Sequence, residues 1–141
     1  MFRNVRLREI MASPAVTVNI QDSFKKVEEK FRMKGIRHLP VLDDAGRIVG
    51  LVTQRDLFRI APPHPTEDGY VFDTTFLNGF ILKYVMTRDP MTLGPDDSLA
   101  KAVEIMARNK YGCIPIVDSE KKILGIVTET DVLKFVSRNL I

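Results

Sequence analysis

The pattern of apolar and polar positions predicts a strand, a helix, two further strands and a second helix in the first half of the chain. A short apolar stretch over 16–18 leads to a segment whose apolar residues recur at helical spacing. Two apolar runs, 38–42 and 48–53, follow, and the polar and small residues between them are typical of a hairpin turn. A second helix is expected over 55–60. The predicted order is therefore β-α-β-β-α.

The second half of the chain repeats the first. A shift of 75 residues aligns 8–60 with 83–135 without a gap, and 13 of the 53 aligned positions are identical. Copy two should therefore begin with a strand over 91–93 and continue in the same order. We expect core-facing residues in the first helix of each copy at Phe24, Val27 and Phe31, and at Leu99, Ala102, Val103 and Met106. One copy cannot bury both faces of its sheet, so we predict an α+β (mixed α/β) fold in which two repeats pack about a pseudo-twofold axis.

Helix-capping residues support these boundaries. An Asp-Ser pair precedes the first helix of each copy, with Ser23 and Ser98 as the expected N-caps. Gly35 suits the left-handed residue that ends a helix. The domain organisation that we predict is repeat 1 over 8–60 and repeat 2 over 83–136.

Residues 61–82 connect the repeats and divide into two parts. The stretch 61–69 is rich in proline and acidic residues and is expected to form a surface loop. The stretch 70–82 is predicted to be a helix with an apolar face, built from Phe72, Phe76, Leu77, Phe80 and Ile81 and capped by Asp73 or Thr74. Such a face either covers the edge of the core between the repeats or serves as a self-association surface.

Composition and charge exclude several classes of protein. The chain has 141 residues, of which 45% are hydrophobic, and no stretch approaches the roughly 20 apolar residues of a membrane helix. One cysteine and two histidines offer no disulfide framework and few ligands for a transition metal. The N-terminal residues do not read as a secretory signal, so a cytoplasmic location is expected. The net charge of +3 is too small for the basic surface of a nucleic-acid-binding protein, so neither a membrane nor a nucleic acid is an expected partner.

Repeated motifs reveal a family resemblance. The run Gly50-Leu51-Val52-Thr53-Gln54-Arg55-Asp56 has its counterpart in Gly125-Ile126-Val127-Thr128-Glu129-Thr130-Asp131. Supporting motifs are Ile10-Met11, Val85-Met86-Thr87, Arg37-His38-Leu39-Pro40-Val41 and Cys113-Ile114-Pro115-Ile116-Val117. Across both copies the chain resembles a tandem pair of cystathionine-β-synthase-type (CBS) domains, the arrangement called a Bateman module.

The resemblance implies a regulatory module without chemistry of its own, which binds adenosine-containing ligands in clefts between the paired repeats. It implies ribose contacts by Asp56 and Asp131 and phosphate contacts by Thr53 and Thr128. It implies adenine contacts, through apolar side chains or backbone, at Thr17, Val18, Ile36, Leu39 and Pro40 in copy one and at Thr92, Leu93, Tyr111, Gly112, Ile114 and Pro115 in copy two. Such modules pair, so a homodimer is also implied.

The Thr-x-x-Asp spacing has a second interpretation, because it is also that of a helix capping box. The two roles can coexist at one helix start. Arg37, His38 and Arg55 have no cationic counterparts in copy two, and copy one carries ten basic and seven acidic residues against eight of each in copy two. We therefore hypothesise that the two sites are not equivalent and that phosphate recognition relies on these three cations, within copy one or across the cleft.

These patterns predict a stand-alone cytoplasmic sensor that binds AMP, ADP or ATP, with or without magnesium, and signals to an effector protein. The alternative is a structural or interaction module with no physiological nucleotide ligand. An enzyme is not favoured, because no catalytic triad, metal cluster, P-loop or Rossmann fingerprint occurs in the sequence, and no catalytic cofactor is expected. Cys113 is interpreted as a small buried residue, and His64 as an exposed one.

Overall fold

The structure, a computed structural model, describes residues 4–61, 64–71 and 81–140. The chain forms two compact units. The copy-one unit comprises 16–44 and 49–89, and the copy-two unit comprises the residues up to 15, the short stretch 45–48 and the chain from 90 onward. Each unit thus joins most of one sequence copy to the segment that precedes the other.

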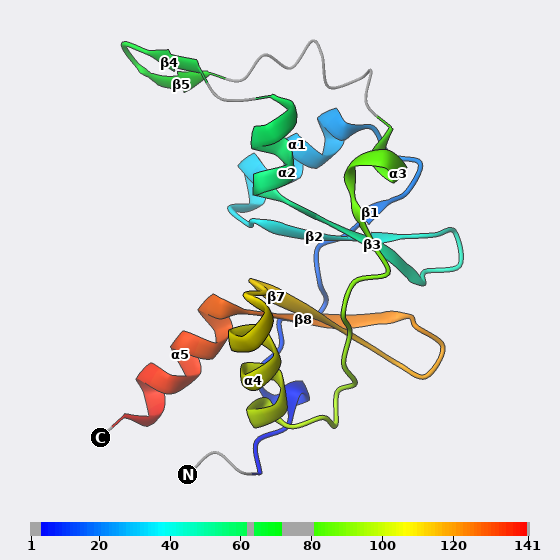
Figure 1. The fold of residues 1–141 in the computed structure, drawn as a ribbon, viewed down its shortest axis with the longest axis vertical. Coiled ribbons are helices and arrows are strands. Elements are labelled where there is room, and N and C mark those ends of the chain that lie inside the picture. Colours follow the sequence, from blue (N-terminus) through cyan, green and yellow to red (C-terminus); the bar gives the residue numbers. More distant parts are fainter. Residues whose placement is uncertain (1–3, 62–63, 72–80, 141) are drawn as a thin grey trace. The chain divides into compact units, whose positions relative to one another are not determined.

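The copy-one unit contains a four-stranded sheet in the order β1-β2-β3-β6. Its elements are β1 (Val18–Asn19), α1 (Phe24–Lys34), β2 (His38–Leu42), β3 (Ile48–Thr53), α2 (Gln54–Ile60), α3 (Leu82–Val85) and β6 (Thr87–Arg88). β1 runs parallel to β2, with Val18 opposite Val41, and β6 runs antiparallel to β3, with Thr87 opposite Leu51. Figure 1 shows α1 and α2 on the same face of β2 and β3. The predicted α+β fold with its β-α-β-β-α order is confirmed here.

The copy-two unit follows the same plan with shorter outer strands. Its elements are the 3-10 helix η1 (Leu7–Glu9), α4 (Leu99–Asn109), β7 (Cys113–Val117), β8 (Ile123–Thr128) and α5 (Glu129–Asn139), and β7 and β8 are antiparallel. Where copy one has β1, this unit has a single parallel bridge between Leu93 and Ile116. The predicted strand over 91–93 is therefore reduced to one bridge. Pro95 explains the difference, because Ile20 at the equivalent position donates its N–H to the Leu42 carbonyl at 2.8 Å, and proline has no N–H.

Helix termini are capped as predicted. Ser23 Oγ accepts from the Lys26 N–H at 3.2 Å, and Ser98 Oγ accepts from the Lys101 N–H at 3.1 Å. Gly35 ends α1 with a φ of 63°, in the left-handed region that glycine adopts without strain. Both first helices therefore begin at the predicted caps, and α1 ends at the predicted residue.

Each unit has its own hydrophobic core. Six of the seven predicted helix residues are buried in these cores: Phe24, Val27, Phe31, Leu99, Ala102 and Met106. The prediction for Val103 is wrong, since this residue is 39% exposed. It lies at the flank of the narrow stripe that Leu99, Ala102 and Met106 form at spacings of three and four residues.

Residues 4–15 belong to the copy-two unit and residues 81–89 to the copy-one unit, and this exchange of segments explains two of the identities between the copies. Met86, which precedes β6, packs against Gly50 of β3, where an added Cβ would lie 2.2 Å from the Met86 sulfur. Met11 packs against Gly125 of β8 in the same way, at 2.8 Å from the position of such a Cβ. Glycine leaves the room that each methionine occupies. The paired methionines and glycines are therefore packing partners that fix each segment on its sheet.

Part of the connection forms a hairpin that the sequence did not predict. β4 (His64–Thr66) pairs antiparallel with β5 (Gly69–Val71), and Gly69 has a φ of 117° at the turn. The prediction of a loop over 61–69 is wrong for β4, and the helix predicted from residue 70 does not begin there, because Tyr70 pairs with Pro65 in the hairpin. Of the other residues predicted for its apolar face and cap, Ile81 is 59% exposed at the start of α3. The rest lie outside the described residues: Phe72, Asp73, Thr74, Phe76, Leu77 and Phe80. None of the helices in the described part of the chain has the length and apolar character that a membrane span requires.

Candidate functional site

The Thr-x-x-Asp motif forms the junction between a strand and a helix in each unit. At the start of α2, Asp56 Oδ2 accepts from the Thr53 N–H at 2.8 Å and from its hydroxyl at 3.2 Å, while the Asp56 N–H donates to Thr53 Oγ1 at 3.4 Å. At the start of α5, the corresponding distances between Thr128 and Asp131 are 2.9, 3.0 and 3.2 Å. The capping-box interpretation of both motifs is confirmed. Each aspartate is held in one orientation by its own helix start.

The second carboxylate oxygen distinguishes the two aspartates. Asp56 is 7% exposed, and its Oδ1 accepts a hydrogen bond from the Arg59 guanidinium, one helical turn further along α2. Asp131 is half-buried, and its Oδ1 has no hydrogen-bond partner within the described ranges 4–61, 64–71 and 81–140. Lys134 stands at the position that corresponds to Arg59 and forms no ion pair within those ranges. The same motif thus presents a paired carboxylate in copy one and an open carboxylate oxygen in copy two.

Backbone hydrogen bonds bring a second predicted segment to each helix start. The Gln54 N–H donates to the Arg37 carbonyl at 2.9 Å, and the Glu129 N–H donates to the Gly112 carbonyl at 3.0 Å. The residue before β2 or β7 therefore adjoins the first residue of α2 or α5. In the copy-one unit, this arrangement brings the backbone of Arg37 to the Thr53 motif. Arg37 and Arg55 are exposed and His38 is half-buried, so the predicted phosphate-binding cations lie at one end of the sheet.

The residues predicted to contact adenine divide between core and surface. The side chains of Val18, Leu39, Leu93 and Ile114 belong to the two hydrophobic cores, and Pro40 and Pro115 are also buried. Contacts from these positions would therefore come from the backbone. The positions that remain accessible are Thr17 and Ile36 in copy one and Thr92, Tyr111 and Gly112 in copy two, with Tyr111 41% exposed.

Two cationic contacts in copy one were not predicted from the sequence. The Lys30 ammonium of α1 donates to the backbone carbonyl of Thr17, and Arg59 pairs with Asp56 as described above. The only signal in the sequence is the mismatch between aligned positions, because Ile105 replaces Lys30 in copy two. No hydrogen bond to the Thr92 carbonyl, the counterpart of that of Thr17, occurs among the residues that the structure describes.

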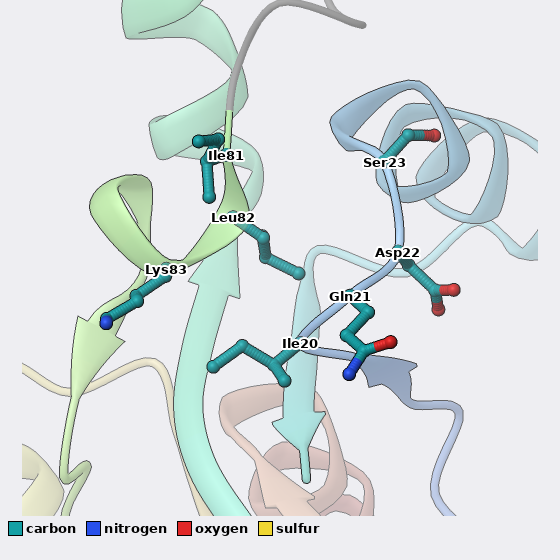
Figure 2. Close-up of a pocket in the computed structure, with 7 residues that line it drawn as sticks. All are labelled: Ile20, Gln21, Asp22, Ser23, Ile81, Leu82 and Lys83. Atoms are coloured by element: carbon teal, nitrogen blue, oxygen red, sulfur yellow. The ribbon is translucent and has the colours of Figure 1, made fainter. Parts of the chain in front are cut away.

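A hollow of about 480 Å³ lies elsewhere in the copy-one unit. Figure 2 shows it between the segment that leads into α1 and the start of α3, with Ile20 and Leu82 among the side chains that line it. None of the residues predicted to bind ligand lines this hollow. It is therefore separate from the Thr-x-x-Asp motifs.

The described residues include neither a reactive cysteine nor a cluster of metal ligands. Cys113 is 4% exposed, and burial, followed by the negative charge of Glu129, raises the pKa of its thiol to about 12. The thiol is therefore protonated at neutral pH and is not a nucleophile. No group of three or more histidine, cysteine, aspartate or glutamate residues in the described ranges could hold a metal ion.

Comparison with known proteins identifies the repeated unit. The sequence profile of the CBS domain matches residues 7–62 and again residues 82–138. The chain belongs to the CBS-domain family. The family resemblance predicted from the motifs is thereby confirmed.

Solved CBS-domain structures share the fold. The CBS domain pair of protein MJ0100, solved with 5′-methylthioadenosine and S-adenosyl-L-methionine, superposes with a TM-score of 0.80 at 21% identity, over 96% of this chain and 98% of that one. CBSX2, solved in complex with AMP, gives a TM-score of 0.76 at 22% identity, over 95% and 97% of the two chains. These likenesses establish the fold of a CBS pair.

Most of the curated relatives compared are much longer proteins, whereas CBS domain-containing protein DDB_G0289609 of Dictyostelium discoideum, 25% identical over 130 residues, is matched over 92% of this chain and 89% of that protein. Inosine-5′-monophosphate dehydrogenase of Korarchaeum cryptofilum is 33% identical over 128 residues, which make up 90% of this chain and 23% of that enzyme. The chain spans between 15% and 42% of the length of seven curated relatives, several of which are enzymes. What the chain shares with these proteins is the CBS pair.

Proposed function

We propose that this CBS pair is a regulatory module that binds an adenine nucleotide, AMP, ADP or ATP, and transmits its occupancy to a partner protein in the cytoplasm. The observation that carries the proposal is the duplicated helix start, where threonine fixes an aspartate carboxylate beside the backbone that precedes β2 or β7. The AMP complex of CBSX2 and the methylthioadenosine complex of MJ0100 support an adenosine-containing ligand. Each is a CBS protein of the same fold.

The chemistry of the helix start suits a nucleotide. A carboxylate held by a capping box retains lone pairs that can accept both hydroxyls of a ribose cis-diol, which assigns ribose to Asp56 and Asp131. Thr53 and Thr128 would donate their hydroxyls to phosphate in exchange for the hydrogen bond that each hydroxyl makes to its aspartate. Arg37, His38 and Arg55 add positive charge in copy one, and magnesium, where present, would accompany the phosphates of ADP or ATP.

Charge predicts how the phosphates contribute to binding. Arg37 is exposed, and its backbone adjoins the start of α2. Arg37→Ala should therefore weaken binding of AMP while leaving binding of adenosine unchanged, because adenosine has no phosphate. Equal losses for the two ligands would show that Arg37 does not act on the phosphate.

Regulation follows from differential affinity. A nucleotide shifts the arrangement of the chain only if it binds one arrangement more tightly than another. The proposed module has no chemistry of its own, and its output is the population of the arrangement that the partner protein recognises.

The proposed module is also a homodimer. α5 is an amphipathic helix of 11 residues without a fully buried residue, and Leu133 on it is 67% exposed. Val103 on α4 of the same unit is 39% exposed. A second copy of the chain would bury such side chains. Size-exclusion chromatography with light scattering should give the mass of a dimer, and a monomer at micromolar concentration would contradict this part of the proposal.

Thermal unfolding with a panel of AMP, ADP, ATP, S-adenosylmethionine and NAD tests the ligand class. A ligand at about 100 times its Kd stabilises the protein by about 2.7 kcal/mol. We expect the adenine nucleotides to raise the Tm. An unchanged Tm with every ligand would favour the alternative, a structural or interaction module with no physiological nucleotide.

A further inference from the structure

The two repeats differ in what already contacts the groups that a nucleoside would use. In copy one, the Lys30 ammonium donates to the Thr17 carbonyl, and the Arg59 guanidinium donates to Asp56 Oδ1. Thr17 is one of the positions assigned above to adenine, and Asp56 is assigned to ribose. Cations of α1 and α2 therefore satisfy two acceptors that a bound nucleoside would need.

Copy two lacks both contacts. Ile105, an apolar residue, stands where copy one has the lysine, and Lys134 at the position of the arginine forms no ion pair in the described part of the chain. The Thr92 carbonyl and Asp131 Oδ1 have no hydrogen-bond partner within 4–61, 64–71 and 81–140. The other oxygen of Asp131 is held at 2.9 Å from the N–H of its capping threonine, so the open oxygen has a fixed position.

We infer that nucleoside binding by the two repeats is unequal: copy two carries the high-affinity adenosine-binding groups, and Lys30 and Arg59 are built-in competitors in copy one. This inference rests on the proposed function and deepens it. An adenosine that binds through copy-one residues must displace two charge-assisted hydrogen bonds, which are stronger than those between neutral groups. One that binds through copy-two residues displaces neither.

Burial makes the copy-one contacts harder to displace. The Asp56 side chain is 10% exposed and the Arg59 side chain is 66% exposed, so the carboxylate is shielded and only its partner lies in solvent. A shielded carboxylate that loses this partner must regain an equivalent one from the ligand. We expect adenosine to bind copy one with an affinity at least about tenfold lower than copy two, which a difference of about 1.4 kcal/mol produces.

The test uses adenosine because it has no phosphate. Contacts between a phosphate and the copy-one cations would otherwise mask the difference in nucleoside affinity between the copies. Calorimetric titration with adenosine should detect one site per chain in the wild-type protein. Asp131→Asn should weaken this site at least tenfold. The double variant K30M/R59Q should bind a second adenosine per chain, because both copy-one acceptors are then open.

Matched controls separate competition from damage to the fold. Lys134→Gln alters the copy-two position equivalent to Arg59 and should leave adenosine binding unchanged. The Tm of each variant, measured without ligand, establishes that it is folded at the titration temperature. An adenosine affinity that falls in R59Q or K30M would show that these cations contact the ligand, and the inference would be wrong.

Other outcomes distinguish this inference from the proposed function. Two equal adenosine sites in the wild-type protein, or one site that requires Asp56 and not Asp131, would overturn the inference and leave adenine-nucleotide binding intact. No binding of adenosine or AMP by the wild-type protein and by K30M/R59Q would overturn both.

Discussion

The glycine of β8 should be among the least replaceable residues of the copy-two unit. A Cβ added at Gly125 would lie 2.7 Å from the Ala12 carbonyl oxygen and 2.8 Å from the Met11 sulfur. The Ala12 carbonyl cannot easily move away, because it accepts from the Ile126 N–H at 3.0 Å while the Ala12 N–H donates to the Ile126 carbonyl at 2.9 Å. Gly125→Ala therefore forces a backbone clash or breaks the bridge that holds the N-terminal segment on the sheet.

The magnitude follows from overpacking. Extra methyl groups in well-packed cores cost about 1–3 kcal/mol. Gly125→Ala should lower the free energy of unfolding by about 3 kcal/mol, because backbone atoms obstruct the added methyl group. Gly50→Ala should lower the free energy of unfolding by about 1 kcal/mol, because the obstructing group is the flexible Met86 side chain. For a chain of this length, the larger cost corresponds to a fall in Tm of about 10 °C.

Chemical denaturation followed by circular dichroism measures both costs. Gly94→Ala is the matched control, because its Cβ would lie 3.6 Å from Asp97 Oδ2, an ordinary contact, and its free energy of unfolding should stay within about 0.5 kcal/mol of that of the wild-type protein. If Gly125→Ala were as stable as Gly94→Ala, the close packing of Met11 and Ala12 against β8 would be refuted.

Two further predictions concern titratable groups. Cys113 should resist alkylation by iodoacetamide at pH 8 in the folded protein and react after unfolding, because its pKa is raised to about 12 and the thiol is buried. Mass spectrometry measures the extent of alkylation, and rapid modification of the folded protein would contradict this prediction. The hydrogen bond from the Gly94 N–H, aided by Lys101, lowers the pKa of Asp97 below 3.8, so its charged form stabilises the native state above that pH. This stabilisation should disappear as the pH falls through the native pKa, and acid titrations of Asp97→Asn should lack that component; the same acid dependence in the variant and the wild-type protein would assign it to other carboxylates.

The sequence was sufficient for those parts of the fold that depend on local patterns. The order of elements, the serine caps of α1 and α4 and the capping boxes at Thr53 and Thr128 all follow from spacing within a few residues. The 75-residue shift also paired Met11 with Met86, but it could not show which sheet each methionine contacts. Each methionine contacts a glycine more than 35 positions away, as Met86 contacts Gly50. The spacing of residues within a motif carries no information on such distant contacts.

Single residues account for the remaining differences. Pro95 shortens the first strand of copy two, and the Gly69 turn places Tyr70 in a hairpin where a helix was predicted. In the candidate site, the motifs predicted where Thr53 and Asp56 meet, but not that Arg59 contacts that aspartate. Capping residues leave a recognisable spacing, whereas a long cation can reach several acceptors, and only the folded backbone selects one.

Calorimetric titration of the wild-type protein with AMP tests the central claim most directly. Binding through a carboxylate fixed at a helix start predicts a saturable heat of binding, which Asp131→Asn weakens at least tenfold. A titration that gives only the heat of dilution, for AMP and for ADP and ATP with magnesium, would contradict the claim that this CBS pair is an adenine-nucleotide sensor.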